Sequence, residues 1–434
     1  MTIVRFLIPL AICIGLDIYA YQAVRVIANR WRTLGWARRA YWWVHALFYL
    51  SLVVTPLAAM AGHRLPPRGY FYLITVFVLL YVPKLAAAAV LLLEDASRMV
   101  RWIWQRLARW LRPAPSPVTA SQPAAGINRK EFLSLTAVAL AGIPLAGIVH
   151  GVVRERYAFT VRRERVTLPG LPPAFDGFRI LQLSDIHVGS FDDLAAVRDG
   201  ITLANAQGAD LIVFTGDLVN DVVDEVGAYG EVFAALRAPL GVLSVLGNHD
   251  YGDYHAWPSD REHAAHFQRM LDCHEALGWR LLRNEHAVFA RGDDRLAVIG
   301  VENWSNRHGF HKRGDLERAT RGLPVGAARI LLTHDPSHWD SEVRPNFGGI
   351  GLTLSGHTHG FQFGVEVPGF RWSPVQYVYR QWAGLYREGG QYLYVNRGFG
   401  HIAFMGRVGI RPEITVFELA REAPDHRDPG PDLA

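Results

Sequence analysis

The sequence predicts two successive units, a membrane region of about four transmembrane helices at residues 1–150 and a soluble α/β domain at residues 157–419. Apolar residues crowd the first 150 positions, whereas Asp, His and Gly become frequent after them. The later part alternates strand-like runs with helical stretches, which is the pattern of an α/β domain. Its length is sufficient to bury a full-sized core without disulfides.

Four apolar runs carry the membrane prediction. They span residues 3–27, 41–61, 70–93 and 132–149. A helix that crosses the hydrocarbon core of a bilayer needs about 20 apolar residues. The second and third runs meet this length, and Lys84 is the single charged residue in the two of them. The first run is interrupted by charges and the fourth is shorter. Buried helices of a soluble protein are the alternative, but uncharged runs of this length are rare in soluble folds.

The basic residues between the runs predict the orientation of the chain. Arg30, Arg32, Arg38 and Arg39 follow the first run, Arg64 and Arg68 follow the second, and Arg98, Arg101, Arg106, Arg109, Arg112, Arg129 and Lys130 follow the third. The positive-inside rule places the first and third loops in the cytoplasm. Four crossings then give a multi-pass protein of the cell membrane with an extracytoplasmic soluble domain. Five arginines at 154–165 favour the opposite, cytoplasmic placement of the soluble domain, although a domain that translocates as a whole can override such local charge.

The net charge, the distribution of basic residues and the cysteine count limit the kinds of partner that the protein is expected to bind. The net charge is +5, and the arginines near the apolar runs suit anionic lipid headgroups. No basic stripe interleaved with aromatic residues occurs in the soluble half, so nucleic acid is not an expected partner. The two cysteines, Cys13 and Cys273, cannot form a disulfide framework within the soluble domain. Residues 113–122 are predicted to be a linker and residues 420–434 a disordered tail.

Polar segments follow five strand-like runs of the soluble half. Asp185 and His187 follow 178–183, Asp217 follows 211–215, Asn248, His249 and Asp250 follow 242–246, His334 follows 330–333, and His357 and His359 follow 350–354. Open α/β sheets bind their ligands at the carboxyl ends of strands. Each segment alone is a common polar turn, but five of them in one order, each after an apolar run, rarely arise by chance.

These segments read Asp-x-His, Gly-Asp, Gly-Asn-His-Asp, a single His and Gly-His-x-His, and in this order they resemble the calcineurin-like metallophosphoesterases over about residues 178–419. The membrane-associated branch is the most similar, through Leu-Ser-Asp-x-His at 183–187, Tyr-Val-Asn-Arg-Gly-Phe-Gly at 394–400 and Arg-Pro-Glu-Ile at 411–414. Phe361 stands where that branch often has Gly. The resemblance implies an α/β fold, a four-layer metallophosphoesterase β-sandwich flanked by helices, and a hydrolase acting on phosphate esters.

The resemblance also implies a dinuclear metal centre. Two divalent ions about 3.5–4 Å apart can clamp a phosphoryl group and generate a hydroxide between them. Asp217 is implied as the carboxylate that bridges them. The other implied ligands are Asp185, His187 and His359 for the first ion, and Asn248, His334 and His357 for the second. Imidazole, carboxylate and amide ligands without a thiolate suit Mn, Fe or Zn and do not choose among these metals.

Further polar residues are candidates for roles beside the metal ions. In the family, the histidine that follows the Asn lies near the leaving group, which makes His249 the implied proton donor. Asp250 either orients that imidazole or caps a helix. Arg397 either contacts a phosphate or forms a structural salt bridge. His308 and His401 could approach a substrate, or they are surface and core residues.

These predictions describe a membrane-anchored enzyme that hydrolyses phosphomonoesters, phosphodiesters or pyrophosphates. Membrane attachment favours a lipid-linked or envelope phosphate ester as the substrate. A nucleotide-linked lipid pyrophosphatase is one alternative, and it requires a cytoplasmic catalytic face. An inactive membrane scaffold on the same fold is the other alternative, but a scaffold is expected to lack ligands, and none of the seven implied ligands is missing.

Overall fold

The computed structural model describes residues 2–60, 67–111 and 127–422. They form two compact units, Met1–His150 and Gly151–Ala434. The predicted linker at 113–122 lies outside the described residues, as does residue 423 onward of the predicted tail. The first two residues of that tail, 420 and 421, belong to the last strand, which ends at Arg421.

The first unit contains helices α1 (Thr2–Arg30), α2 (Trp36–Met60), α3 (Pro67–Leu111) and most of α4 (Arg129–Val153), whose residues from Gly151 onward belong to the second unit. The described residues hold four helices that are long and apolar enough to cross a membrane, which confirms the predicted number. Helix α3 is longer than the predicted membrane span at 70–93, since it continues to Leu111. Its extension holds four arginines, which favour helix, and neither Gly nor Pro, and Arg98 Nη2 pairs with Asp95 Oδ1 at 2.9 Å.

A buried polar cluster joins α1, α2 and α3. Lys84 of α3 is ion-paired with Asp17 of α1, and both side chains are buried. The hydroxyls of Tyr49 and Tyr81 donate to the other oxygen of Asp17 at 2.5 and 3.1 Å, and Nε2 of His45 lies 2.5 Å from Nζ of Lys84. Charged groups inside a membrane are costly unless they are paired. The charges that interrupt two of the apolar runs therefore neutralise each other.

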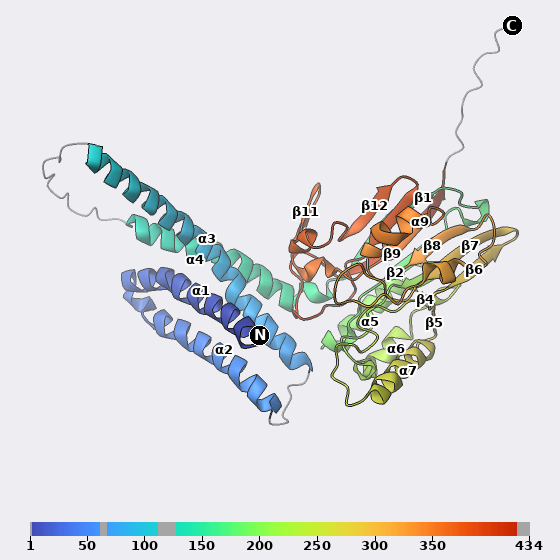
Figure 1. Cartoon of the computed structure of the whole chain (residues 1–434), viewed down its shortest axis with the longest axis horizontal. Helices are drawn as coiled ribbons and strands as arrows, with labels where there is room; N and C mark the ends of the chain where they lie inside the picture. Colours follow the sequence, from blue (N-terminus) through green and yellow to red (C-terminus); the bar gives the residue numbers. More distant parts are fainter. Residues whose placement is uncertain (1, 61–66, 112–126, 423–434) are drawn as a thin grey trace, which may run out of the picture. The chain divides into compact units, whose positions relative to one another are not determined.

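The second unit is built around two six-stranded sheets (Figure 1). The first sheet has the order β1 (Thr160–Leu168), β14 (Glu413–Arg421), β2 (Arg179–Leu183), β3 (Leu211–Phe214), β4 (Val242–Ser244) and β5 (Trp279–Leu281). The second has the order β12 (Gly384–Glu388), β13 (Gln391–Val395), β9 (Leu352–Ser355), β8 (Ala328–Leu332), β7 (Asp294–Gly300) and β6 (Glu285–Arg291). Each of the five predicted strands that precede a polar segment is present. Strands β2 to β5 run parallel, as do β7, β8, β9 and β13, so their carboxyl ends share one edge of each sheet.

Three apolar cores order this unit into four layers. One core lies between the sheets and joins residues such as Ile180 of β2 and Leu354 of β9. A second packs the other face of the first sheet against α5 (Leu194–Asn205), α6 (Gly230–Phe233) and α7 (Asp260–Ala276). The third packs the second sheet against α8 (Leu316–Thr320) and the helical turn η7 (Trp339–Val343), which continues into α9 (Arg344–Asn346). The predicted four-layer sandwich flanked by helices is confirmed.

A small hairpin stands apart from both sheets. Strands β10 (Val365–Val367) and β11 (Phe370–Trp372) pair antiparallel and are connected by Pro368 and Gly369. Gly369 has a φ of +79°, the left-handed conformation that the second central position of a type II turn requires.

Candidate metal centre

The seven residues implied as metal ligands lie in loops that follow β2, β3, β4, β8 and β9. The first three strands are neighbours in one sheet and the last two are neighbours in the other. Because the sheets pack face to face and these strands are parallel within each sheet, the loops meet at one edge of the sandwich. Two groups of side chains that could hold a metal ion result, Asp185 with His187 and His359, and Asp217 with His334 and His357.

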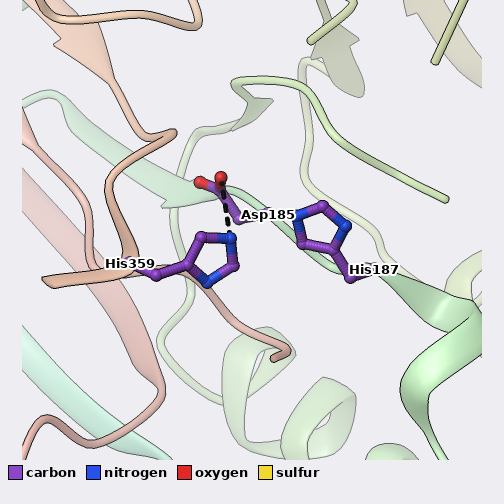
Figure 2. A group of neighbouring side chains, drawn as sticks. All are labelled: Asp185, His187 and His359. Carbon is purple, nitrogen blue, oxygen red and sulfur yellow. Dashed lines mark ion pairs between the residues drawn. The ribbon is translucent and has the colours of Figure 1, made fainter. Parts of the chain in front are cut away.

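Asp185, His187 and His359 form the first group (Figure 2). Their ligand atoms lie within 4.8 Å of one another, and all three side chains are buried. Nε2 of His359 is 3.3 Å from Oδ1 of Asp185, the ion pair marked by the dashed line in Figure 2. The ring of His187 lies to the right of the other two side chains in this view, 4.9 Å from the ring of His359.

The second group contains Asp217, His334 and His357, again with ligand atoms within 4.8 Å. Oδ2 of Asp217 is 3.0 Å from Nε2 of His334, which is 3.2 Å from Nδ1 of His357. The same Oδ2 is also 3.5 Å from Nε2 of His187 in the first group. The carboxylate of Asp217 therefore lies between the two groups.

The backbone of the site is strained. Five of the seven residues have left-handed φ angles between 48° and 71°, namely Asp185, His187, Asp217, His357 and His359. Non-glycine residues adopt this conformation at a cost, and such residues cluster at functional sites where the surrounding structure holds them. The loops also approach one another closely, since a Cβ on Gly356 would lie 2.1 Å from Oδ2 of Asp185.

Hydrogen bonds from the second ring nitrogen orient the imidazoles. Nδ1 of His187 lies 3.2 Å from the carbonyl of Val219, and Nδ1 of His334 lies 2.8 Å from that of Thr215. Both nitrogens donate to these carbonyls, which leaves Nε2 free as a ligand. His357 is turned the other way, because its Nε2 is 2.8 Å from the hydroxyl of Tyr379.

The charges of the site favour a cation. Burial raises the pKa of Asp185 and of Asp217, but the neighbouring imidazoles outweigh burial, and the pKa of both carboxyls falls below its usual range. Burial lowers the pKa of His187 and of His357, so both rings are neutral at pH 7. At His334 burial lowers the pKa, but the carboxylate of Asp217 raises it to about 10. Two buried carboxylates need positive charge, and an ion bound to His334 must displace a proton.

The residues present fit divalent ions. The side-chain oxygen of Asn248 is buried and accepts no hydrogen bond from any described residue, while its amide group lies 2.9 Å from the hydroxyl of Tyr254. A buried acceptor without a donor is costly unless a ligand uses it. Within the two groups, neighbouring donor atoms are 3.0 to 3.3 Å apart. Ligands about 2.0–2.2 Å from one ion are separated by about this distance.

His249 and Asp250 have different surroundings. The half-buried ring of His249 packs 4.9 Å from that of His187, and its Nδ1 lies 2.5 Å from the carbonyl of Asn220. Asp250 neither orients this ring nor caps a helix. Its buried carboxylate accepts hydrogen bonds from the backbone N–H groups of Asp217, Leu218, Val219 and Gly247 at 2.7–3.4 Å. Asp250 thus joins the loop after β3 to the loop after β4.

The other open alternatives are resolved by burial. Arg397 is a structural residue, since its side chain is 2% exposed and pairs with Glu413 at 2.6 Å and Glu366 at 2.5 Å. His401 is a core residue that lies 5.8 Å from the ring of Phe191. His308 is exposed in the segment before α8.

Residues that support the ligands were missing from the sequence-based set. Nη2 of the fully buried Arg407 lies 3.3 Å from Nδ1 of His359 and also donates to the carbonyls of Arg397 and Gly398. Burial lowers the pKa of Arg407 to about 9. Tyr379 supports His357 in the same way, with its hydroxyl also 3.3 Å from Asp335. Nothing in the local sequence distinguishes such residues from surface Arg and Tyr.

Comparisons with known proteins agree with this geometry. A model of the calcineurin-like phosphoesterase family matches residues 178–361, and a model described as the transmembrane domain of a probable calcineurin-like phosphoesterase matches residues 4–156. The uncharacterized metallophosphoesterase YkuE of Bacillus subtilis (strain 168) is 31% identical over 302 residues, which cover 68% of this chain and 98% of that protein. The chain belongs to the calcineurin-like phosphoesterase family.

Two further relatives are matched over different shares of their own length. The phosphodiesterase YaeI of Escherichia coli (strain K12) is 28% identical, and the match covers 68% of this chain and 99% of that protein. A transmembrane protein with metallophosphoesterase domain from Danio rerio is also 28% identical, with 68% of this chain but 64% of that protein covered. The phosphoesterase is therefore a membrane protein and a hydrolase of phosphate esters that uses divalent metal ions.

Proposed function

We propose that the phosphoesterase hydrolyses phosphodiester bonds of lipid-linked or envelope phosphates outside the cytoplasm, with two divalent ions held by Asp185, His187, Asp217, Asn248, His334, His357 and His359. The position of Asp217 carries this proposal, because one carboxylate oxygen lies 3.0 Å from His334 and 3.5 Å from His187, in reach of both groups. When bound, such ions supply positive charge for the phosphoryl oxygens and lower the pKa of a water molecule.

His249 is proposed to protonate the leaving group. The contact of its Nδ1 with the carbonyl of Asn220 holds a proton on Nδ1, which leaves Nε2 to carry and release the catalytic proton. The backbone N–H of His249 donates to Oδ1 of Asp217 at 2.8 Å, so the imidazole is tied to the carboxylate between the two groups. No metal needs this imidazole as a ligand, because seven other residues are present.

The diester preference rests on the name of one relative, the phosphodiesterase YaeI, and on the membrane helices of this chain. Hydrolysis of an alkyl phosphodiester releases an alkoxide as the leaving group, and this group departs more readily when it is protonated. The choice of a lipid-linked or envelope substrate follows from the membrane attachment of the enzyme, which keeps the metal centre near phosphates at the bilayer surface.

The charge distribution supports the extracytoplasmic orientation. Several of the arginines that follow the fourth apolar run are used within the domain. Arg156 pairs with Asp192 at 3.0 Å, Arg162 with Glu366 at 2.6 Å, and Arg165 with Glu418 at 3.8 Å. Because these arginines serve folded ion pairs, they carry less weight as orientation signals than the loop arginines between the helices.

Metal analysis tests the proposed centre. We expect two transition-metal ions per chain in the active protein, and Asp217→Asn to lose more activity than the loss of any single histidine, since both ions depend on this carboxylate. The measurement is elemental analysis of the purified full-length protein together with hydrolysis of bis(p-nitrophenyl) phosphate. Full activity with a single bound ion would refute the dinuclear proposal.

Labelling of an introduced cysteine tests the orientation. Val325 is fully exposed and is not one of the proposed ligands, so Val325→Cys in a Cys13→Ser, Cys273→Ser background reports on the compartment of the domain. We expect a membrane-impermeant maleimide to label this cysteine in right-side-out vesicles without permeabilisation. Labelling only after permeabilisation would place the domain in the cytoplasm and favour a nucleotide-linked lipid pyrophosphatase.

A further inference from the structure

The hairpin β10–β11 has one polar face and one apolar face. Its cross-strand pairs are Val365 with Trp372, Glu366 with Arg371, and Val367 with Phe370. Residues directly opposite each other in an antiparallel pair project to the same side, and neighbours along a strand project to opposite sides. The first and third pairs therefore form one entirely apolar face.

The polar face is attached to the domain. The carboxylate of Glu366 pairs with Arg162 of β1 at 2.6 Å and with the buried Arg397 at 2.5 Å. Arg371 donates to the carbonyl of Ala383 at 2.5 Å. These contacts fix which way the hairpin is turned, so the apolar face points away from the domain.

The apolar face is exposed. Val365, Val367 and Phe370 are 46%, 52% and 57% exposed, and Trp372 is partly exposed. Nε1 of Trp372 lies 3.5 Å from the hydroxyl of Tyr377, whose side chain is 78% exposed. We call these five residues the hairpin patch. Contiguous apolar surface on a soluble domain marks a site that contacts a protein or a membrane.

Within the second unit, backbone hydrogen bonds connect the base of this hairpin to Gly151, the residue with which the unit begins. The N–H of Arg407 donates to the carbonyl of Gly151 in the last turn of α4 at 3.2 Å. On its other side, the same segment pairs with the base of β10, since Gly364 donates to the carbonyl of Val408 at 2.9 Å and Val408 donates to that of Gln362 at 2.7 Å. Residues 407–408 therefore lie between Gly151 and the base of the hairpin.

Short segments of chain connect the hairpin to the metal centre. The chain leaves β11, forms the short 3-10 helix η9 (Pro374–Tyr377), and reaches Tyr379, which supports His357 at 2.8 Å. At the other end, β10 begins a few residues after His359, and the intervening Phe361 is 48% exposed. The hairpin is thus connected at both of its ends, within a few residues, to side chains of the metal centre.

We propose that the hairpin patch inserts into the bilayer surface and holds the metal centre over lipid phosphates. The bilayer is the apolar phase nearest along the chain, because the membrane helix α4 continues into Gly151, and Gly151 is hydrogen-bonded within the second unit to the segment that carries the hairpin. The inference rests on the proposed function, in that it names a membrane lipid as the substrate class. It also makes a statement about membrane contact that is independent of catalysis.

Site-specific fluorescence tests the contact itself. In the Cys13→Ser, Cys273→Ser background, the environment-sensitive dye NBD is attached to Phe370→Cys or, as the matched control, to Val325→Cys, and the full-length protein is placed in lipid nanodiscs. We expect the emission of the probe at 370 to shift to shorter wavelength and to be quenched by lipids with a nitroxide near the headgroup, and the probe at 325 to show neither change. A probe at 370 that behaves like the control overturns the proposal. A shifted emission without quenching by the nitroxide lipid means that protein covers the patch, and this outcome also overturns it.

Kinetics with two matched substrates test the role of the contact. Bis(p-nitrophenyl) phosphate in solution and a phosphatidyl p-nitrophenol in vesicles release the same leaving group. We expect the Val367→Asp, Phe370→Asp double variant to lose roughly tenfold or more of its turnover on the vesicle substrate, since burial of these side chains is lost, and to keep wild-type turnover on the soluble ester. Val325→Asp should change neither. Equal slowing on both esters, or no slowing, overturns the proposal. A wild-type enzyme that cleaves neither ester contradicts the proposed function, while the fluorescence result stands by itself.

Discussion

Replacing Asp250 with Asn tests whether one buried carboxylate holds two ligand loops together. Oδ2 of Asp250 accepts from the N–H groups of Asp217 and Gly247 at 2.9 and 2.8 Å, and Oδ1 accepts from Leu218 and Val219 at 2.7 and 3.4 Å. An Asn side chain has almost the same shape, but its amide nitrogen donates hydrogen bonds and cannot accept them. Whichever way the amide is turned, two backbone N–H groups face another donor.

The magnitude follows from these hydrogen bonds. A buried donor left without an acceptor costs about 1–3 kcal/mol, so two such donors cost about 2–6 kcal/mol. This loss is a large part of the total stability of a typical domain, which is about 5–15 kcal/mol. The two loops carry Asp217 and Asn248, so we expect metal affinity to fall together with the free energy of unfolding.

The assay is unfolding by guanidinium chloride of the detergent-solubilised full-length protein, with and without a chelator, combined with metal titration. Asp253→Asn is the matched control, because Asp253 is partly exposed and pairs at 2.9 Å with Arg313, whose side chain is 35% exposed. Surface pairs of this kind contribute about 0–1 kcal/mol. If Asp250→Asn is as stable as Asp253→Asn and binds metal like the wild type, the proposed connection between the loops is wrong.

Three other predictions concern the proton donor, the membrane unit and acid stability. His249→Ala should keep both metals and slow hydrolysis by about 10²–10⁴-fold, least for a nitrophenyl ester and most for an alkyl ester; equal slowing of both esters would contradict proton donation. Lys84→Met should lower the thermal unfolding temperature in detergent, because it leaves Asp17 buried without its cation at a cost of about 3–5 kcal/mol, and Asp17→Asn in the same chain should restore part of the loss. Burial lowers the pKa of His274 to about 4 in the folded protein. Between about pH 6.5 and pH 4 this imidazole is therefore protonated in the unfolded chain but neutral in the folded chain. The wild type should therefore lose about 3 kcal/mol more stability than His274→Asn between pH 7 and pH 4, as measured by guanidinium unfolding of the chelated proteins; parallel pH profiles would show that this ring is not the cause.

The amino-acid sequence by itself determined the membrane helices, the strands that precede the ligand loops and the candidate ligands. These features are local. A helix that crosses a bilayer needs an unbroken apolar run, and a parallel strand buried on both faces needs a short one. A ligand loop needs particular residues directly after its strand. Asp217 illustrates this case, since its apolar run, its preceding Gly and its carboxylate are adjacent along the chain. The boundary of α3 was the exception, because an apolar run ends where charges begin, whereas a helix ends where its backbone hydrogen bonds end.

Only the tertiary structure decided what the supporting polar residues do. Asp250 was a possible orienter of the next ring, yet its partners are backbone groups around Asp217, more than 30 positions earlier. Arg397 pairs with glutamates of two separate strands, and Arg407 lies beside His359 because their loops meet at the edge of the sandwich. The exposure of the apolar face of the hairpin could not be predicted either, because a strand of alternating Val and Glu does not show which of its two sides packs against the domain. A charged or apolar side chain acquires its role from the partner it meets, and which distant segments meet is set by how the two sheets pack against each other.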